Sequence, residues 1–390
     1  MDKQERVLTV FTRTLTYILV AVLASLVTFF LCMGQGRSGQ SKLDQLESLI
    51  LNCFIGEADQ TAIEDAAANA MVSALGDRWS YYIPASEYAA HMEQMQNAYV
   101  GIGVTVTVTE DKTGLRVAQV EPGSPALAAG ILPEDIIIGV EGQLVSNLGS
   151  DGAKNMIRGE EGTQVSVTVL RGEEEKTFTV TRGKIKVAVA QGQMLPDNIG
   201  LVTIKNFDER CAQETVAAVK TLVEQGAKAI IFDVRNNPGG YKNELVDILD
   251  FLLPEGDLFR SLSYTGKETV DTSDKECLKL PMAVLVNGGS YSAAEFFAAA
   301  LEEYDWAVVV GEQTSGKGYF QNTIKLNDGS AVGLSVGKYF TPKGVSLAEV
   351  GGLTPKIPVP VTGETAAMIY AGLLAPEEDP QIQAAVNALK

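Results

Sequence analysis

Two short apolar runs, each ending in a glycine-rich loop, constrain the fold of this chain more than any other feature. Residues 229–235 (A-I-I-F-D-V-R) lead into N-N-P-G-G, and residues 282–286 (M-A-V-L-V) lead into N-G-G-S-Y-S. Helical patterns accompany them at Ala212–Gln225 and along an apolar stripe from Leu245 to Leu252. Buried strands that alternate with helices predict an α/β sheet. Both glycine loops would lie at the carboxyl ends of strands, where such sheets bind ligands.

The second loop presents a serine at the start of a predicted helix. Ser292 precedes A-A-E-F-F-A-A-A-L, Lys317 lies 25 residues later (317 − 292 = 25) between two glycines, and Gln321 follows. A serine hydroxyl becomes nucleophilic when a base takes its proton, and a lysine kept neutral by burial can be that base. The helix start favours a negatively charged intermediate. If a strand begins near Lys317, Gln321 shares its face and can orient the amine.

The same residues have a plainer interpretation. Ser292-Ala-Ala-Glu295 is a capping box, and most such serines only satisfy free N–H groups of the helix. A Gly-Lys-Gly triplet is most often a turn with a solvated lysine. His91 is the only histidine and is predicted to be an exposed helical residue, which disfavours a Ser-His-Asp triad.

An uncharged segment of twenty residues, 14–33 (33 − 14 + 1 = 20), lies near the N-terminus. It is long enough to cross a bilayer as a helix, and no A-x-A cleavage site follows it. We expect residues 1–36 to form a cytoplasmic stub and an uncleaved signal anchor. The protein would be single-pass in the cell membrane with its remainder extracytoplasmic; a cleaved signal and secretion form the alternative.

Charge and cysteine content exclude several classes of function. The net charge of −18 argues against a nucleic-acid partner, because phosphate binding requires clustered Lys and Arg. Cys53, Cys211 and Cys277 are odd in number outside the apolar segment and form no C-x-x-C, so no disulfide framework or zinc site is implied. We predict no metal and no cofactor.

Residues 99–182 change to alternating strands separated by glycines, as in V-T-V-T-V-T and V-S-V-T-V-L-R. The block resembles a PDZ domain, and the run E-P-G-S-P-A-L-A-A-G-I-L-P-E-D is its most distinctive part. The resemblance implies that Gly101, Ile102 and Gly103 form the carboxylate-binding loop. PDZ domains add a C-terminal peptide to a sheet edge, which implies recognition of chain ends.

Three motifs, D-V-R-N-N-P-G-G, S-Y-S-A-A-E and T-S-G-K-G-Y-F-Q, occur in this order. They resemble motifs of the carboxy-terminal processing peptidases, the S41 family of serine proteases, whose patterns include S-A-S-A-E and T-x-G-K-G-x-x-Q. The resemblance implies that Ser292 is the nucleophile, Lys317 the general base and Gln321 its partner. Two departures are Tyr291, where the family usually has alanine, and Lys356, where an acidic residue is expected.

The resemblance also implies an oxyanion hole. The N–H of Ala293 would act with a glycine N–H from the N-N-P-G-G loop, from Gly239 or, in preference, Gly240. We expect Asp233 and Arg235 to stabilise this loop rather than to take part in the chemistry.

The implied fold is α/β (α+β) and multidomain: a crotonase/ClpP-like protease core with an inserted PDZ domain, an N-terminal transmembrane helix and flanking helical segments. The helices at both ends of the chain are candidates for homodimerisation. The expected parts are 1–36 (stub and anchor), 37–97 (helical), 98–183 (PDZ), 184–360 (protease core) and 361–390 (helical tail).

The sequence thus predicts a membrane-anchored serine endopeptidase that recognises protein substrates by apolar C-terminal tails. PDZ occupancy is expected to gate the active site, provided that the peptide binds one of two states better. A non-proteolytic PDZ scaffold and a crotonase-like acyl-CoA enzyme are the alternatives.

Overall fold

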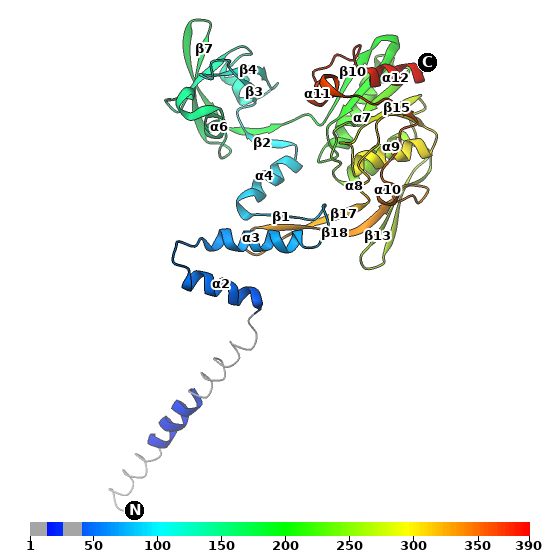
Figure 1. Cartoon of the computed structure of the whole chain (residues 1–390). Coiled ribbons are helices and arrows are strands. Elements are labelled where there is room, and N and C mark those ends of the chain that lie inside the picture. The colour runs from blue at the N-terminus through cyan, green and yellow to red at the C-terminus, as the bar shows by residue number, and fades with distance from the viewer. Residues whose placement is uncertain (1–13, 26–40) are drawn as a thin grey trace, which may run out of the picture. The chain divides into compact units, whose positions relative to one another are not determined.

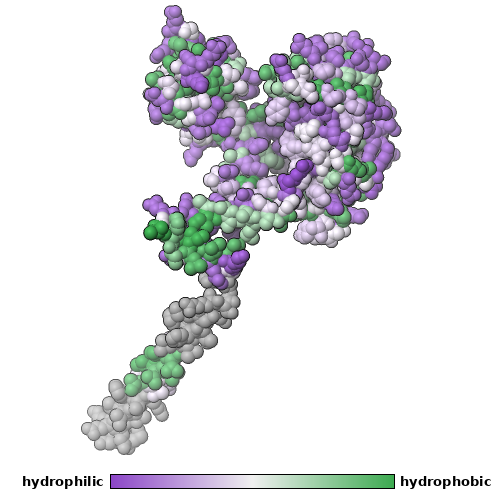
Figure 2. Space-filling view, viewed as in Figure 1, coloured by the Kyte–Doolittle hydropathy of each residue, from purple (hydrophilic) through white to green (hydrophobic). Residues whose placement is uncertain are grey.

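A computed structural model describes residues 14–25 and 41–390, which form two compact units, one up to Gly76 and one from Asp77 onward (Figure 1). Residues 14–25 are helical, and α2 (Lys42–Cys53) and α3 (Gln60–Ser73) follow in the first unit. Figure 2 shows apolar colouring over α2 and α3. The large exposed apolar side chains in and around α2 and α3 are Leu43, Leu46, Leu49, Leu51, Phe54, Ile55, Met71 and Leu75.

The predicted anchor is only partly described, because residues 1–13 and 26–40 lie outside the described ranges. Within those ranges, no helix has both the length and the apolar character needed to cross a membrane. Cys32 and most of the predicted stub also lie outside the described residues.

The PDZ-like block folds into an antiparallel sheet with its own core. The strand order is β3-β4-β5-β7-β8, so β3 lies at the end of the sheet, and β6 pairs with β5. The core consists of side chains such as Leu115, Val117, Ile137 and Val167, all fully buried. The elements are β3 (Val104–Val108), β4 (Leu115–Val120), α5 (Pro125–Ala129), β5 (Ile136–Val140), β6 (Gln143–Leu144), α6 (Val145–Ile157), β7 (Gln164–Arg171) and β8 (Glu174–Thr181).

Two short strands flank this block. β2 (Ala98–Gly101) pairs antiparallel with β9 (Gly183–Lys186), so the chain enters and leaves the block side by side. In the chain, the strand that precedes β2 and the strand that follows β9 belong to two other sheets. This arrangement agrees with an inserted domain.

The remaining chain is built on the expected α/β sheet, in the order β10-β11-β12-β15-β16-β19. All neighbours are parallel except β10 and β11. The two apolar runs are its central strands β12 and β15. The strands are β10 (Ala190–Leu195), β11 (Ile199–Ile204), β12 (Ala229–Asp233), β15 (Met282–Val286), β16 (Ala307–Gly311) and β19 (Ile357–Pro358), and the helices between them include α7 (Cys211–Glu224), α8 (Lys242–Leu252) and α9 (Ala293–Glu303).

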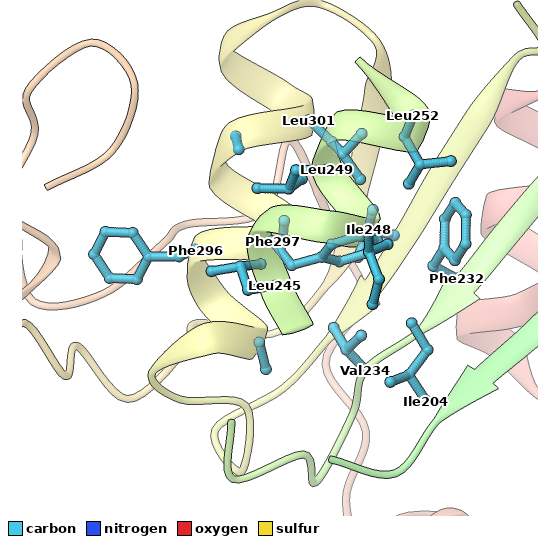
Figure 3. Close-up of a cluster of buried hydrophobic side chains, with 14 of the residues drawn as sticks. Ile204, Phe232, Val234, Leu245, Ile248, Leu249, Leu252, Phe296, Phe297 and Leu301 are labelled. Carbon is cyan, nitrogen blue, oxygen red and sulfur yellow. The ribbon is translucent and has the colours of Figure 1, made fainter. Parts of the chain in front are cut away.

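Both faces of this sheet are covered, because its strands carry apolar residues on each side. Ile230 and Phe232 contribute to the core under α7, α8 and α9, whereas Ile231 contributes to the core on the other face. Figure 3 shows side chains of α8 and α9 packed against the strand residues Phe232 and Ile204. The rings of Phe232 and Phe297 meet edge to face at 5.2 Å, a favourable aromatic geometry.

The second face is covered by α12 (Pro380–Ala388), which buries Ile382, Ala385 and Val386. The helical tail is a candidate for homodimerisation, which stays a prediction. The apolar face of α12 packs within its own chain and is therefore not available to a second copy. The preceding helix α11 (Gly363–Ala371) has no buried residue.

A second sheet contains β1 (Tyr81–Ile83), β13 (Gly256–Ser263), β14 (Glu268–Ser273), β17 (Tyr319–Lys325) and β18 (Ala331–Phe340). The sequence Asn-Asp-Gly, which favours a tight turn, joins β17 and β18 as a hairpin. The segment before the PDZ-like block is not helical throughout: besides α4 (Ala85–Met95) it supplies β1, which pairs with β18. His91 lies in α4 as expected, but it is half-buried and its ring is 6.0 Å from that of Tyr81.

A buried ion-pair network joins the loop after β12 to the start of α12. Arg235 donates to Asp233 at 2.6 and 2.9 Å and to Asp379 at 2.8 Å. Asp379 in turn accepts from two N–H groups of the first turn of α12. The expectation that Asp233 and Arg235 stabilise this loop is therefore confirmed.

Substitution of Asp379 tests this network. Asp379→Ala removes one carboxylate from a buried guanidinium and the cap of α12, so we expect unfolding free energy to fall by about 3–5 kcal/mol. Urea unfolding measures the change. The exposed neighbour provides the control, and Glu378→Ala should shift stability by no more than about 0.5 kcal/mol. Equal stability of the two variants would contradict a structural role for the network.

Candidate active site

Ser292 lies at a sharp turn between β15 and α9. Its φ and ψ are 57° and −129°, a backbone conformation that residues other than glycine rarely adopt. The loop after β12 packs directly behind it: a Cβ on Gly239 would lie 2.7 Å from the Ser292 Cβ. Such strain persists only where the surroundings determine it, and it concentrates at functional sites.

The carboxylate of Glu295 joins this turn to the loop that carries Lys317. Glu295 is fully buried and accepts from the N–H groups of Ser292 (3.0 Å), Gly316 (2.8 Å) and Lys317 (2.7 Å) and from the Thr314 hydroxyl (2.6 Å). Burial raises the pKa of Glu295, while the hydrogen bonds act in the opposite direction. The glutamate of the predicted capping box thus extends beyond its own helix and brings Ser292 and Lys317 together.

The predicted catalytic and oxyanion residues line one cavity of about 590 Å³. It also contains tyrosines and apolar side chains from α4, α8 and the second sheet. The PDZ loop residues and His91 do not line it. The six predicted residues that do are Gly239, Gly240, Ser292, Ala293, Lys317 and Gln321.

Lys317 and Lys242 are the two lysines that line this cavity. Burial lowers the pKa of the Lys317 amine to about 8, although the charges of Asp77 and Glu295 act to raise it. The Lys317 Nζ lies 4.8 Å from the ring centre of Trp79 and 5.8 Å from that of Tyr291. A large fraction of such a lysine is neutral near pH 8, as a general base requires.

The expectation that Lys317 and Gln321 share one face of a strand is wrong. Lys317 precedes β17 rather than lying in it, and a bulge between Phe320 and Gln321 interrupts the alternation. The Gln321 amide donates to the Ser335 hydroxyl at 2.9 Å and to the Tyr319 carbonyl at 3.2 Å. Within the described residues, no hydrogen bond joins it to Lys317.

Residues before β1 complete this side of the site. The Asp77 carboxylate accepts from the Ser80 hydroxyl at 2.7 Å and from the Trp79 N–H at 3.1 Å. Burial opposes ionisation of Asp77, but hydrogen bonds led by that from Ser335 outweigh it and lower its pKa. Asp77 is therefore an anion whose field acts on Lys317.

Tyr339 contacts the serine directly, which the sequence did not indicate. Its hydroxyl donates to Ser292 Oγ at 2.9 Å from strand β18. The ring packs edge to face on Phe296, with centroids 4.5 Å apart, and burial raises the pKa of the phenol. Tyr339 begins the sequence Y-F-T-P-K-G, which does not by itself indicate a catalytic role.

The glycine loop after β12 presents one N–H group to the cavity. The Gly239 N–H donates to the Asn237 side chain at 2.8 Å, and the Gly239 carbonyl accepts from Phe207 at 2.7 Å. In a trans peptide the next N–H points opposite to that carbonyl, so the Gly240 N–H points away from Phe207. Neither this N–H nor that of Ala293 has a hydrogen-bond partner among the described residues.

The predicted PDZ loop leads into the edge strand β3. Ile102 is fully buried, and its carbonyl accepts from Ala126 at 2.8 Å. Gly103 has φ of 83°, and a Cβ there would lie 2.4 Å from the Ser124 Cβ. Only glycine fits at this position, so the turn into β3 depends on it.

Comparison with known proteins agrees with this arrangement. The profile of peptidase family S41 matches residues 198–359, and a PDZ domain profile matches 100–181. The carboxy-terminal processing protease CtpA of Bacillus subtilis (strain 168) is 33% identical over 342 residues, which cover 84% of this chain and 72% of that protein. The chain belongs to peptidase family S41.

Other members of the family agree. A "probable CtpA-like serine protease" of Staphylococcus aureus (strain COL) is 33% identical over 340 residues, covering 84% of this chain and 68% of that protein. An S41 protease structure from Bacteroides fragilis has a TM-score of 0.52 at 16% identity, covers 90% of this chain and 98% of its own, and supports the fold alone. As a member of this family, the present chain is a serine-type peptidase. The alternatives of a non-proteolytic PDZ scaffold and of a crotonase-like acyl-CoA enzyme are thereby excluded.

The described residues contain no group of three or more His, Cys, Asp or Glu side chains arranged to hold a metal ion.

The pKa of Lys317 predicts the pH dependence of activity. If the neutral amine is the base, kcat/KM should rise with pH below about 8 and level off above it. An uncharged peptide substrate isolates this ionisation. Asp77→Asn removes a charge that raises the pKa of Lys317, so the rise in kcat/KM should occur at lower pH in this variant. A rise centred near pH 10 in the wild type would contradict a buried lysine base.

Proposed function

We propose that the S41 site is a Ser-Lys peptidase centre acting on protein chains. The observation that carries this proposal is the Glu295 carboxylate, which hydrogen-bonds both the Ser292 turn and the Lys317 loop and brings them to one cavity. In the reaction, neutral Lys317 takes the proton of the Ser292 hydroxyl as Oγ attacks the peptide carbonyl. The ammonium then protonates the leaving amine, and water hydrolyses the acyl-enzyme by the same route.

The developing oxyanion would be held by the N–H groups of Ala293 and Gly240. Both line the cavity and both lack other partners among the described residues, so they need not break bonds to receive it. Tyr339 keeps Ser292 Oγ in place by donating to it, which leaves the serine proton free for the base. Gln321 stays a proposed partner of Lys317; in that role its amide would leave the Ser335 hydroxyl when substrate binds.

We further propose that the PDZ domain selects substrates with apolar C-terminal tails. Edge strand β3 offers unpaired backbone groups for an added strand, and the preceding residues Gly101–Gly103 would receive the terminal carboxylate. The name of the Bacillus subtilis relative, a carboxy-terminal processing protease, supports the same substrate class. A single-pass anchor, extracytoplasmic substrates and a homodimer through the N-terminal helices complete the proposal.

Two substitutions test the centre. Cleavage of an unfolded protein with an apolar C-terminus should fall by about 10⁴-fold or more in both Ser292→Ala and Lys317→Ala. The exposed lysine in the β13–β14 turn serves as control, and Lys267→Ala should retain full activity. Circular dichroism checks that each variant is folded. Cleavage that persists in Ser292→Ala would show that another residue is the nucleophile.

The predicted gating by the PDZ domain is tested with a tethered C-terminal ligand. Its presence should change kcat/KM for an unrelated reporter peptide, because a ligand shifts a two-state equilibrium when it binds one state better. Gly103→Ala should abolish the effect, since its Cβ would clash with Ser124. Gly172→Ala, at a similar φ of 64° with open space around it, is the matched control. An unchanged reporter rate in the wild type would refute gating.

A further inference from the structure

Asp208 is a buried carboxylate in the cavity of Ser292 for which the proposed mechanism has no use. It lies in the loop between β11 and α7, is 6% exposed and lines the cavity. No hydrogen bond reaches its carboxylate from the described residues. Among the described residues no side-chain oxygen is both fully buried and unpaired, so the oxygens of Asp208 are open to the cavity. A mostly buried carboxylate that has no protein partner and faces a substrate cavity is available to a substrate group.

Among the described residues no ion pair includes Asp208. Arg210, two positions later, pairs with Glu214, and Lys242, which lines the same cavity, donates to Asp271 at 2.8 Å. The Glu244 carboxylate accepts from the Ala212 N–H at 2.7 Å. Burial, followed by the charges of Glu244 and Glu209, raises the pKa of Asp208 to about 7. An incoming cation would relieve this unfavourable environment.

The backbone of Asp208 also lies next to Gly240, whose N–H group is proposed to bind the oxyanion. Phe207 pairs with Gly240 as an isolated parallel bridge, and a Cβ on Gly240 would be 2.7 Å from the Asp208 backbone nitrogen. A substrate whose carbonyl enters the proposed oxyanion hole therefore passes within a few ångströms of the Asp208 loop. Extended peptides advance about 3.3 Å per residue, so only residues close to the scissile bond can reach it.

The cavity around Asp208 suits a long basic side chain. Met95, Leu245, Phe259 and Phe320 supply apolar walls that can cover a methylene stem, while a carboxylate receives the charged end. Arginine fits this requirement best, because its guanidinium stays charged and binds a carboxylate through two parallel bonds.

We propose that Asp208 selects an arginine or lysine side chain within two residues of the scissile bond. The inference rests on the proposed peptidase function of Ser292 and adds a specificity to it. Recognition of the C-terminal tail by the PDZ domain and recognition at the cleavage site would then be independent: the first apolar, the second basic.

The test compares peptides that contain arginine or citrulline at each of the two positions on either side of the cleaved bond. Citrulline has nearly the shape of arginine without its charge. At pH 9, where Asp208 is ionised and Lys317 is mainly neutral, wild type should prefer arginine by about tenfold in kcat/KM at one position. Asp208→Asn should reduce the ratio to about one. Asp208→Glu, which retains the charge, should restore part of it.

The exposed neighbour Glu209 provides the matched control, and Glu209→Gln should keep the preference of the wild type. Cleavage of the citrulline peptides by Asp208→Asn shows that the variant is folded and active. If the wild type shows no preference for arginine, or if Asp208→Asn keeps that preference, the proposed role of Asp208 is wrong. The proposed peptidase function is unaffected by either result. Cleavage that survives Ser292→Ala overturns the proposed function and this inference with it.

Discussion

The arrangement of the site depends on one buried carboxylate. Glu295 binds three backbone N–H groups and a hydroxyl, and these groups come from the start of α9 and from the loop before β17. Neither segment holds the other through apolar packing alone, because one is a strained turn and the other is rich in glycine. Hydrogen bonds to a charged acceptor in a dry interior are strong and directional. A single residue thereby links the backbone of the serine turn to the backbone of the lysine loop.

The lysine shows a balance between burial and nearby charge. Its surroundings exclude water through Trp79 and Tyr291, yet two carboxylates prevent the pKa from falling further. A fully apolar pocket would make the amine neutral but too weak a base, and an exposed one would keep it charged. Tyr291, which departs from the usual alanine, contributes to this enclosure and lines the substrate cavity as well.

The sequence predicted those features that local pattern determines. Apolar strands β12 and β15 were identified from composition, their parallel pairing follows from the helices between them, and the Asn-Asp-Gly turn placed the β17–β18 hairpin. Because both glycine loops follow neighbouring parallel strands, their meeting at one edge was also predictable. Family resemblance then assigned roles to Ser292 and Lys317, roles that await direct measurement.

Features that depend on tertiary pairing could not be predicted. The bulge that turns Gln321 toward Ser335 arises from its register with β18, which no local pattern reveals. Tyr339 and Asp208 gain their significance from burial beside residues distant in the chain. The docking of α12 depends on an ion pair between Arg235 and Asp379, which are separated by 144 positions.

One consequence of the fold concerns the order in which the chain is synthesised. β1 precedes the PDZ-like insertion but pairs with β18, so Tyr81 meets Gly333, 252 positions later (333 − 81 = 252). Loop closure over such distances is slow, and a chain emerging from the ribosome cannot make this contact until most of it exists. The PDZ-like block, whose pairings are local, can fold much earlier. A nascent chain would therefore acquire its peptide-binding module well before its proteolytic centre.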